Sequence, residues 1–283
     1  MRRQGSSPRS CSWSLTSPSP RSRVAIHSRR RKTVTTTSPA CARPVFANSR
    51  KGDDPMRWPD DYTDPASIRF PEDRWDPTFK AYIEEARKHP DRLAAITLID
   101  PPDVATSRGE LDTLLNYPHA SDFNARRPEI INENSKPPES LFAPLQAQAG
   151  GPKVKTRKML IEIKDWSLPY IMYFKSVWMR PRPDHLDSSI STVIPAPGHP
   201  AYPSGHSTQA HLMALVGYEI CQDTTIRKAL WAAADRIAQN REYAGVHYRS
   251  DSLCGAELAK QLLAFFIAER SADIEAIKGE EWP

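Results

Sequence analysis

Residues 175–251 include a set of three fixed cations, two histidines and one carboxylate whose types and spacing could do chemistry together. Lysine and arginine donate charged hydrogen bonds to oxyanions, and a histidine beside them can serve as a nucleophile, an acid or a base. This composition suits a tetrahedral oxyanion such as phosphate or vanadate. In chain order the six residues are Lys175, Arg182, His206, Arg241, His247 and Asp251.

His247 and Asp251 stand four residues apart, so they can share one face of a helix. An aspartate that accepts from one ring nitrogen fixes the tautomer and leaves the other nitrogen free to attack or to ligate. Arg241 stands six residues before His247, which is off that face on a regular helix. The sequence therefore predicts a break near Gly245 that returns Arg241 to the anion.

The segment Pro203-Ser204-Gly205-His206 comes directly before a predicted helix. Backbone N–H groups at a helix N-terminus point toward bound anions, and Gly205 lets the backbone approach closely because it has no side chain. Ser204 can add a hydroxyl donor or can cap the helix. We expect His206 to be held beside the anion.

Lys175 and Arg182 stand seven residues apart, which is two turns of helix and places both on one face. Arg180 is only five residues from Lys175 and is expected to point elsewhere, so we favour Arg182 as the second cation. Pro181 and Pro183 weaken this geometry because they indicate that the helix ends here.

Three sequence blocks, residues 175–183, 203–206 and 240–251, resemble the signature of the type 2 phosphatidic acid phosphatase and vanadium haloperoxidase superfamily. That signature reads Lys, six residues, Arg-Pro; then Pro-Ser-Gly-His; then Ser-Arg, five residues, His, three residues, Asp. The chain matches every block except that Asn240 replaces the usual serine, which should weaken support for the site rather than stop the reaction. The blocks occur in the family's order, separated by 19 residues (184–202) and 33 residues (207–239). The resemblance covers residues 156–268 and implies an all-α helical bundle.

Other histidines and acidic residues have no partner at catalytic spacing. His199 stands seven residues before His206, where bromide-oxidising haloperoxidases also carry a histidine, but we favour a loop residue without a catalytic role. Three glutamates fall in a proline-rich stretch, residues 117–155, that is predicted to be mostly loop; they are interpreted as solvated, not as a metal site. They are Glu129, Glu133 and Glu139. The remaining histidines, for which no role is expected, are His27, His89, His119, His185 and His211.

Apolar residues at spacings of three, four and seven predict four helices in the second half of the chain. They span residues 156–180 (where Pro169 can introduce a kink), 206–221, a segment whose N-cap is expected to be Thr224 or Thr225, and 252–277. Earlier, Asp76-Pro77 indicates a helix start, and Ser107 with Glu110 resembles a capping box before residues 109–116. No segment shows the sustained alternation of a strand, so the predicted fold is all-α, a helical bundle.

The basic charge is confined to one end of the chain. Residues 1–52 hold 12 of the 39 Lys and Arg residues and no Asp or Glu, so residues 53–283 carry 27 basic and 34 acidic residues, a net charge of −7. Residues 1–52 are predicted to be a disordered, Arg- and Ser-rich tail, and this composition also fits a transit segment or a wrong start before Met56. Residues 53–283 are expected to form one domain that does not bind nucleic acid.

The longest apolar run, Leu262 to Ala268, is far shorter than the ~20 residues of a membrane-spanning helix, so we expect a soluble protein without a membrane span. No secretory signal peptide is recognisable, which leaves the cytoplasm or, if the start is misassigned, the periplasm. Cys11 and Cys41 lie in the tail, whereas Cys221 and Cys254 lie in predicted helices and are expected to be reduced and buried. The sequence does not indicate the oligomeric state.

The resemblance implies a phosphoric monoester hydrolase similar to the class A bacterial acid phosphatases. His247 would carry a phosphohistidine, Asp251 would orient it, and His206 would act as acid and then as base. The substrate is expected to be a small phosphorylated molecule, and neither a cofactor nor a metal is expected. The phosphate-binding residues would be Lys175, Arg182, Ser204, Gly205 and Arg241.

The alternative is a vanadium-dependent haloperoxidase that oxidises halide with hydrogen peroxide in the same pocket. Vanadate would then be the cofactor, His247 would ligate vanadium, and His206 would assist peroxide binding. The chain is short for that branch, which favours the phosphatase. A third hypothesis, an anion-binding module without turnover, is disfavoured because simple binding requires only donors and cations, not the full set of His206, His247 and Asp251.

Overall fold

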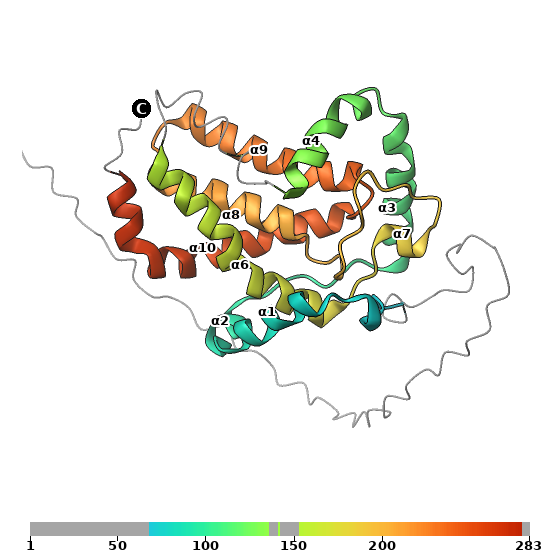
Figure 1. Cartoon of the computed structure of the whole chain (residues 1–283), viewed down its shortest axis with the longest axis horizontal. Helices are drawn as coiled ribbons and strands as arrows, with labels where there is room; N and C mark the ends of the chain where they lie inside the picture. The colour runs from blue at the N-terminus through green and yellow to red at the C-terminus, as the bar shows by residue number, and fades with distance from the viewer. Residues whose placement is uncertain (1–67, 136–140, 142–152, 279–283) are drawn as a thin grey trace, which may run out of the picture. The chain divides into compact units, whose positions relative to one another are not determined.

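The computed structural model describes residues 68–135, 141 and 153–278 of the 283-residue chain. Over these residues the chain forms helices joined by loops and contains no strand, which confirms the predicted all-α helical bundle (Figure 1). The chain divides into two units, Met1–Lys51 and Gly52–Pro283. The predicted tail over residues 1–52 lies outside the described residues, and so do His27, Cys11, Cys41 and Glu139.

Helix α8 (Gly205–Ile220) is the centre of the bundle. It packs against α6 (Val154–Trp178), α9 (Thr224–Tyr243) and α10 (Arg249–Lys278) (Figure 1). The consecutive residues Leu212, Met213 and Ala214 are all fully buried, which shows that the middle turn of α8 is covered on every side.

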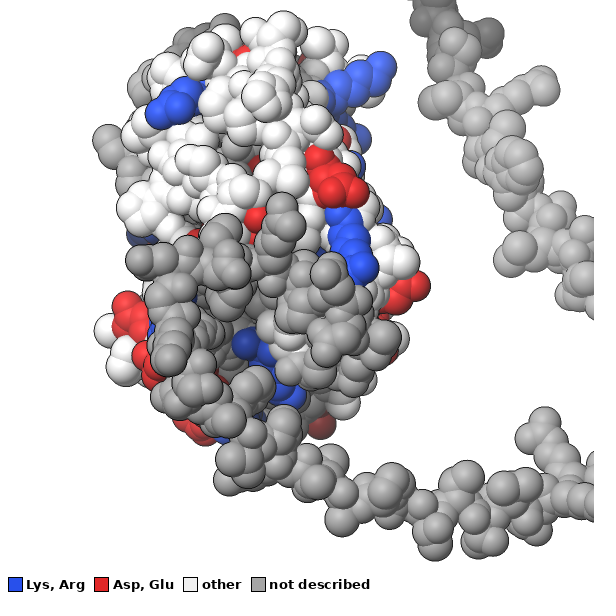
Figure 2. Space-filling view, turned by 90° about the vertical axis from the view of Figure 1, so that its right-hand side faces the viewer, with Lys and Arg blue, Asp and Glu red and all other residues white. Residues whose placement is uncertain are grey.

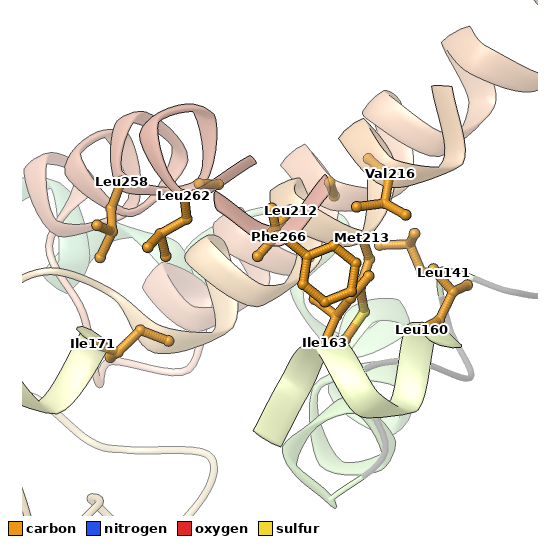
Figure 3. Packing of buried hydrophobic residues seen from close by; sticks show 14 of the residues in the cluster. Leu141, Leu160, Ile163, Ile171, Leu212, Met213, Val216, Leu258, Leu262 and Phe266 are labelled. Atoms are coloured by element: carbon orange, nitrogen blue, oxygen red, sulfur yellow. The ribbon is translucent and has the colours of Figure 1, made fainter. Parts of the chain in front are cut away.

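The apolar core joins α6, α8 and α10. Figure 3 shows Phe266 of α10 beside Ile163 of α6 and Met213 of α8. At the other end of α10, a Cβ atom on Gly255 would lie 2.6 Å from the Ser204 carbonyl oxygen. This glycine therefore lets α10 approach the N-terminal end of α8, where the site is built.

The helices that precede the core cover one side of α6. After the short turn η1 (Glu72–Arg74), α1 (Pro77–Arg87) packs on α6 and is followed by α2 (Pro90–Ala95). The predicted start of α1 is confirmed, since the Asp76 side chain accepts a hydrogen bond from the Thr78 N–H group.

The N-cap predicted for the next helix is wrong. Helix α3 spans Val104–Asn116, and its N-cap is Asp103, whose carboxylate accepts from the Thr106 N–H group. Ser107 lies inside the helix and is buried, and Glu110 makes no capping box because its carboxylate is used by distant residues. An aspartate one turn earlier satisfies the same free N–H groups and so starts the helix sooner.

The first part of the stretch 117–155 is helical rather than loop, because η2 (Tyr117–His119) is followed by helix α4 (Phe123–Ser135), which packs on α9. Pro128 lies inside α4 and costs it one backbone hydrogen bond. Phe123 and Ile130 of this helix are buried, and their packing outweighs the proline signal. Glu133 is fully buried, so its interpretation as a solvated residue is also wrong.

The four predicted helices of the second half are confirmed, with local differences. Helix α6 runs through Pro169 and ends at Trp178, and its C-cap Met179 has a left-handed φ of 52°. The N-cap of α9 is Asp223, not Thr224 or Thr225, because the Asp223 carboxylate accepts from two N–H groups of the first turn. Helix α10 bends at Arg270, whose backbone is not helical.

The surface carries mixed charge on the face that Figure 2 shows, where red and blue side chains lie near one another. Within the described ranges, no helix is long and apolar enough to cross a membrane. Cys221 and Cys254 are free and buried, as predicted.

Candidate active site

His247 and Asp251 are in contact at the start of α10. His247 lies just before the helix and Asp251 in its first turn, so they meet across a helix N-terminus rather than along a helical face. The Nδ1 atom of His247 lies 2.9 Å from Oδ2 of Asp251, and the Tyr248 N–H group donates to the same oxygen at 3.0 Å. The Nε2 atom of His247 lies 3.4 Å from Nη1 of Arg182. Because a guanidinium group can only donate, the proton of His247 resides on Nδ1 and Nε2 keeps its lone pair.

His247 is neutral in this setting. Its ring is 2% exposed, and burial, followed by the charges of Arg182 and Lys175, holds its pKa well below the ordinary value. The charge of Arg241, and that of His206 when it is protonated, also lower the pKa of His247. A neutral imidazole with a free Nε2 is a competent nucleophile or ligand.

The predicted break before His247 is confirmed. Helix α9 ends at Tyr243, and Gly245 has a φ of 72°, which a residue with a side chain rarely adopts. The chain turns back so that the Val246 N–H group donates to the Arg241 carbonyl at 3.2 Å.

Arg241 is buried and only partly hydrogen-bonded. Its Nη2 atom donates to the Ile130 carbonyl at 2.9 Å and to Oε2 of Glu133 at 3.3 Å. Its Nε and Nη1 atoms have no hydrogen-bond partner among the described residues. Buried donors without partners are costly, so these two atoms are suited to an anion that enters the site.

His206 lies one residue into α8 and is also incompletely paired. One ring nitrogen is hydrogen-bonded to the backbone of Glu133, and Nε2 is buried without a partner in the described part of the chain. Burial, and then the charge of Arg241, lowers the pKa of His206 to about 3. His206 is therefore neutral near pH 7 in this structure.

Ser204 joins the N-terminus of α8 to α10. Its Oγ atom accepts from the Ser207 N–H group at 3.4 Å, so the capping role is the one observed. Its own N–H group donates to the Asp251 carbonyl at 2.9 Å. Gly205 begins the helix, and the N–H groups of this first turn have no acceptor within the helix.

Lys175 is fully buried and directs its ammonium group at the loop before α8. Its Nζ atom donates to the carbonyls of Pro200, Ala201 and Pro203 at 2.7, 2.8 and 2.7 Å. Burial, followed by the charge of Arg182, lowers its pKa well below the ordinary value. All three ammonium donors are thus used to hold the loop that carries Ser204.

Arg182 does not share a helical face with Lys175, because α6 ends at Trp178 and Arg182 is the N-cap of α7 (Pro183–Leu186). Arg182 nevertheless lies close enough to Lys175 for its charge to lower the pKa of the Lys175 ammonium group. Arg182 donates to backbone carbonyls on both sides of the site, those of Pro197, His199 and Val246, besides its contact with His247.

His199 lies beside the same guanidinium group. Its Nδ1 atom is 3.1 Å from Nη2 of Arg182, and its ring packs edge-on against Phe79. The structure therefore brings His199 to the site, which its loop position did not predict. His211, by contrast, is hydrogen-bonded to Ser207 and Asp235 within the bundle.

Four further residues contact the site and were not assigned to it from sequence. Arg180 donates to Oδ1 of Asp251 at 2.6 Å, and Glu110 contacts Arg180 at 3.0 Å. Glu133 contacts Arg241, and Asn240 donates to both Glu129 and Glu133. The glutamates have no periodic spacing to the motif residues that could have revealed them. Arg180 stands beside the Arg-Pro motif, which was the available signal.

Residues 167–270 match the family model of the PAP2 superfamily. This range contains every residue predicted for the site, from Lys175 to Asp251. This part of the chain is therefore similar to the PAP2 superfamily. The similarity supports a phosphatase-type function in general. Glu110 and Glu133 lie outside the PAP2 match and reach the site from the preceding helices.

No curated protein matches the chain. Among solved structures, the chain is similar to the first transmembrane PAP2 type phosphatidylglycerolphosphate phosphatase from Bacillus subtilis. The two share 18% identity with a TM-score of 0.35, and the match covers 69% of this chain and 93% of the other. Across the described residues, no group of three or more His, Cys, Asp or Glu side chains is arranged to hold a metal ion.

Proposed function

We propose that the protein is a phosphatase that hydrolyses phosphomonoesters through a phosphohistidine at His247. The observation that carries this proposal is the pairing of the two ring nitrogens. Nδ1 is bound to Asp251, and Nε2 faces the guanidinium group of Arg182. A nucleophilic nitrogen is thereby aimed at the place where a cation would hold the phosphoryl group.

The phosphate group would bind between Arg241 and the N-terminus of α8. Arg241 has two unpaired donors, and the helix start at Ser204 and Gly205 supplies backbone N–H groups and a positive dipole end. Lys175 and Arg182 donate to carbonyls in the empty site, so direct contact with phosphate requires each to exchange one carbonyl for a phosphate oxygen. In either arrangement their charges stabilise negative charge on the phosphoryl oxygens.

The proposed reaction has two steps. In the first, Nε2 of His247 attacks phosphorus, the bond to the leaving oxygen breaks, and His206 gives that oxygen its proton. In the second, water attacks phosphorus, the N–P bond breaks, and His206 takes the proton from water. His206 must bind a proton before the first step, and a bound phosphate dianion favours this because it opposes the charge of Arg241 that lowers the pKa of His206. No metal or cofactor takes part in this scheme.

Trapping of the covalent intermediate tests the proposal. The wild-type protein should hydrolyse p-nitrophenyl phosphate, and rapid acid-free quenching with labelled substrate should place phosphate on His247. His247→Ala should form no phosphoprotein. His206→Ala should form it from the good leaving group p-nitrophenolate but should release it ~10²–10⁴-fold more slowly. Label on any other residue would refute the assignment.

The haloperoxidase alternative is retained because His199 lies 3.1 Å from Arg182. If the protein is a phosphatase, vanadate should inhibit hydrolysis competitively, because it becomes five-coordinate like the phosphoryl transition state. If it is a haloperoxidase, bromide oxidation by peroxide should appear only with vanadate, and phosphate should compete. We expect vanadate-inhibited hydrolysis that survives His199→Ala; vanadate-dependent bromide oxidation with negligible hydrolysis would establish the alternative.

A further inference from the structure

Asp251, which orients His247, is itself held by a second buried charge. Its Oδ2 atom accepts from His247 and from the Tyr248 N–H group, whereas Oδ1 accepts from Nη1 of Arg180 at 2.6 Å. The Asp251 side chain is fully buried and that of Arg180 is 7% exposed. Because water does not reach this pair, Arg180 is the cation that balances the Asp251 carboxylate on the side away from His247.

Arg180 is fixed in turn by groups from α3 and from the start of α10. Its Nη2 atom donates to Oε2 of Glu110 and to Oγ of Ser107, both at 3.0 Å and both on α3. Its Nη1 atom also donates to Oγ of Ser250 at 2.7 Å, and its Cζ atom lies 3.9 Å from the centre of the Tyr248 ring. A planar guanidinium group can make these contacts at once, and a lysine ammonium cannot.

Glu110 completes the connection between α3 and the start of α10. Its Oε1 atom accepts from the Ser250 N–H group at 2.6 Å, and Oε2 accepts from the Ser250 hydroxyl at 2.8 Å. The carboxylate thus binds Arg180 and the residue next to Asp251 together. Helix α3, which lies outside the PAP2 match, is therefore connected to His247 by successive contacts: Glu110 binds Arg180, Arg180 binds Asp251, and Asp251 binds His247.

We propose that Arg180 is a positioning residue for the reaction at His247: held by Glu110, it fixes the Asp251 carboxylate that orients the imidazole. The expected effect on catalysis rests on the proposed function, whereas the positioning of Asp251 and His247 does not. Arg180 touches no reacting atom. Its positive charge also limits how strongly Asp251 attracts the Nδ1 proton, so it keeps His247 neutral and its Nε2 lone pair available.

Three variants separate orientation from charge. Arg180→Gln removes both, and we expect kcat to fall about 10- to 100-fold, as when other groups that orient a histidine through a carboxylate are lost. The acidic limb of the kcat/KM profile should also move to higher pH, because loss of a cation favours protonation of His247. Arg180→Lys keeps the charge and should keep the limb near its wild-type position while kcat still falls. Glu110→Gln removes a negative charge, so the acidic limb of its kcat/KM profile should not move to higher pH.

The other charged groups that act on His247 are unchanged in these variants: Arg182, Lys175, His206 and Arg241. Arg92→Gln is the matched control, because Arg92 is also partly buried and bound to an acid, Glu269, and to Tyr170 on α6. It should leave the pH profile unchanged. Equal profiles for wild type, Arg180→Gln and Arg180→Lys, or the same shift in Arg92→Gln, would overturn the proposal.

A readout without turnover keeps the inference separate from the proposed function. In ¹⁵N-histidine NMR spectra of the full chain, wild-type His247 should show a protonated Nδ1 and an unprotonated Nε2. Arg180→Gln should broaden or shift these signals, and Glu110→Gln should give a smaller change of the same kind. If p-nitrophenyl phosphate is not hydrolysed, the proposed function fails, and the spectra still decide the role of Arg180. If Arg180→Gln does not fold, Arg180→Lys and Glu110→Gln carry the test: unchanged His247 signals in both would contradict it.

Discussion

The Nη2 atom of Arg241 lies 3.3 Å from Oε2 of Glu133, and both side chains are almost completely buried. Glu133 comes from α4, and Asn240 donates to the same carboxylate oxygen at 3.0 Å. Burial raises the pKa of Glu133, but the hydrogen bond from Asn240 and the charge of Arg241 oppose this. The carboxylate thus fixes one nitrogen of Arg241 and leaves the other two for an anion.

Glu133→Gln should reveal this role through the effect of phosphate on stability. Loss of one partner of a buried ion pair costs about 3 kcal/mol, so the variant should unfold at lower denaturant concentration than wild type without phosphate. Inorganic phosphate should restore more stability in the variant than in wild type, because it becomes the counter-charge of Arg241. Denaturant midpoints with and without phosphate measure both effects.

The control for this variant is Glu129→Gln on the same helix. Glu129 also accepts from Asn240 but pairs with Arg236 instead of Arg241. It should not change the response to phosphate. If phosphate stabilises the two variants equally, Glu133 is not the group that balances the charge of Arg241.

The stability of the empty protein should fall as the pH falls below about 6.5. The pKa of His206 is lowered to about 3 in the folded state, whereas an unfolded histidine titrates near 6.5. Between these values the unfolded state binds the extra proton, so acid favours unfolding, by up to about 1.4 kcal/mol per pH unit for one such histidine. His199 and His247 have lowered pKa values and add to the slope.

Denaturant unfolding at pH 7, 6 and 5 measures this slope. His206→Asn should make it shallower, because one group that resists protonation is removed. A slope in the His206→Asn variant equal to that of wild type would mean that His206 is not a neutral buried group.

Binding of phosphate should transfer a proton to His206. The anion opposes the charge of Arg241 that lowers the pKa of His206, so a bound anion raises that pKa and His206 gains a proton. Near pH 6 free phosphate is mainly the monoanion and loses a proton when it binds as the dianion, so calorimetric titration in buffers of different ionisation enthalpy measures the sum of the two effects. We expect less net proton release in wild type than in His206→Asn; equal values in the two proteins would contradict the acid role of His206.

Gly245→Ala should impair both stability and activity. Gly245 has a φ of 72°, and a Cβ atom there would lie 3.1 Å from Cγ2 of Ile190 and 3.2 Å from the Ser191 carbonyl oxygen. The strained conformation alone costs about 1–2 kcal/mol, and its relief would move the segment that holds His247. Thermal unfolding and kcat should both decrease.

Gly109→Ala provides the comparison, since no atom lies within 4 Å of a Cβ atom at that position in α3. This substitution should be neutral or should stabilise the protein by up to about 1 kcal/mol. If Gly245→Ala behaves like Gly109→Ala, the turn at Gly245 is not needed to place His247.

The sequence by itself determined the elements whose signals are local. The contact between His247 and Asp251, the Pro-Ser-Gly-His start of α8 and the break at Gly245 were all predicted and are all found, although His247 lies before the helix and not on a shared helical face. Each depends on backbone geometry within a few residues, so side-chain type and spacing were sufficient. The same holds for the apolar periodicity of α6, α8, α9 and α10, which gave the all-α fold.

Only the tertiary structure decided which distant residues meet. Glu133 and Arg241 are 108 residues apart in the chain, and Glu110 and Arg180 are 70 apart. Their contacts depend on how α4 packs on α9 and where α3 meets α10, and no local pattern encodes this. From sequence, the charge of Glu133 favoured a solvent-exposed position. Glu133 is buried only because α4 continues through Pro128 and packs against α9. For the same reason the sequence predicted that Arg180 points away from the site, although in the fold it holds the carboxylate that orients His247.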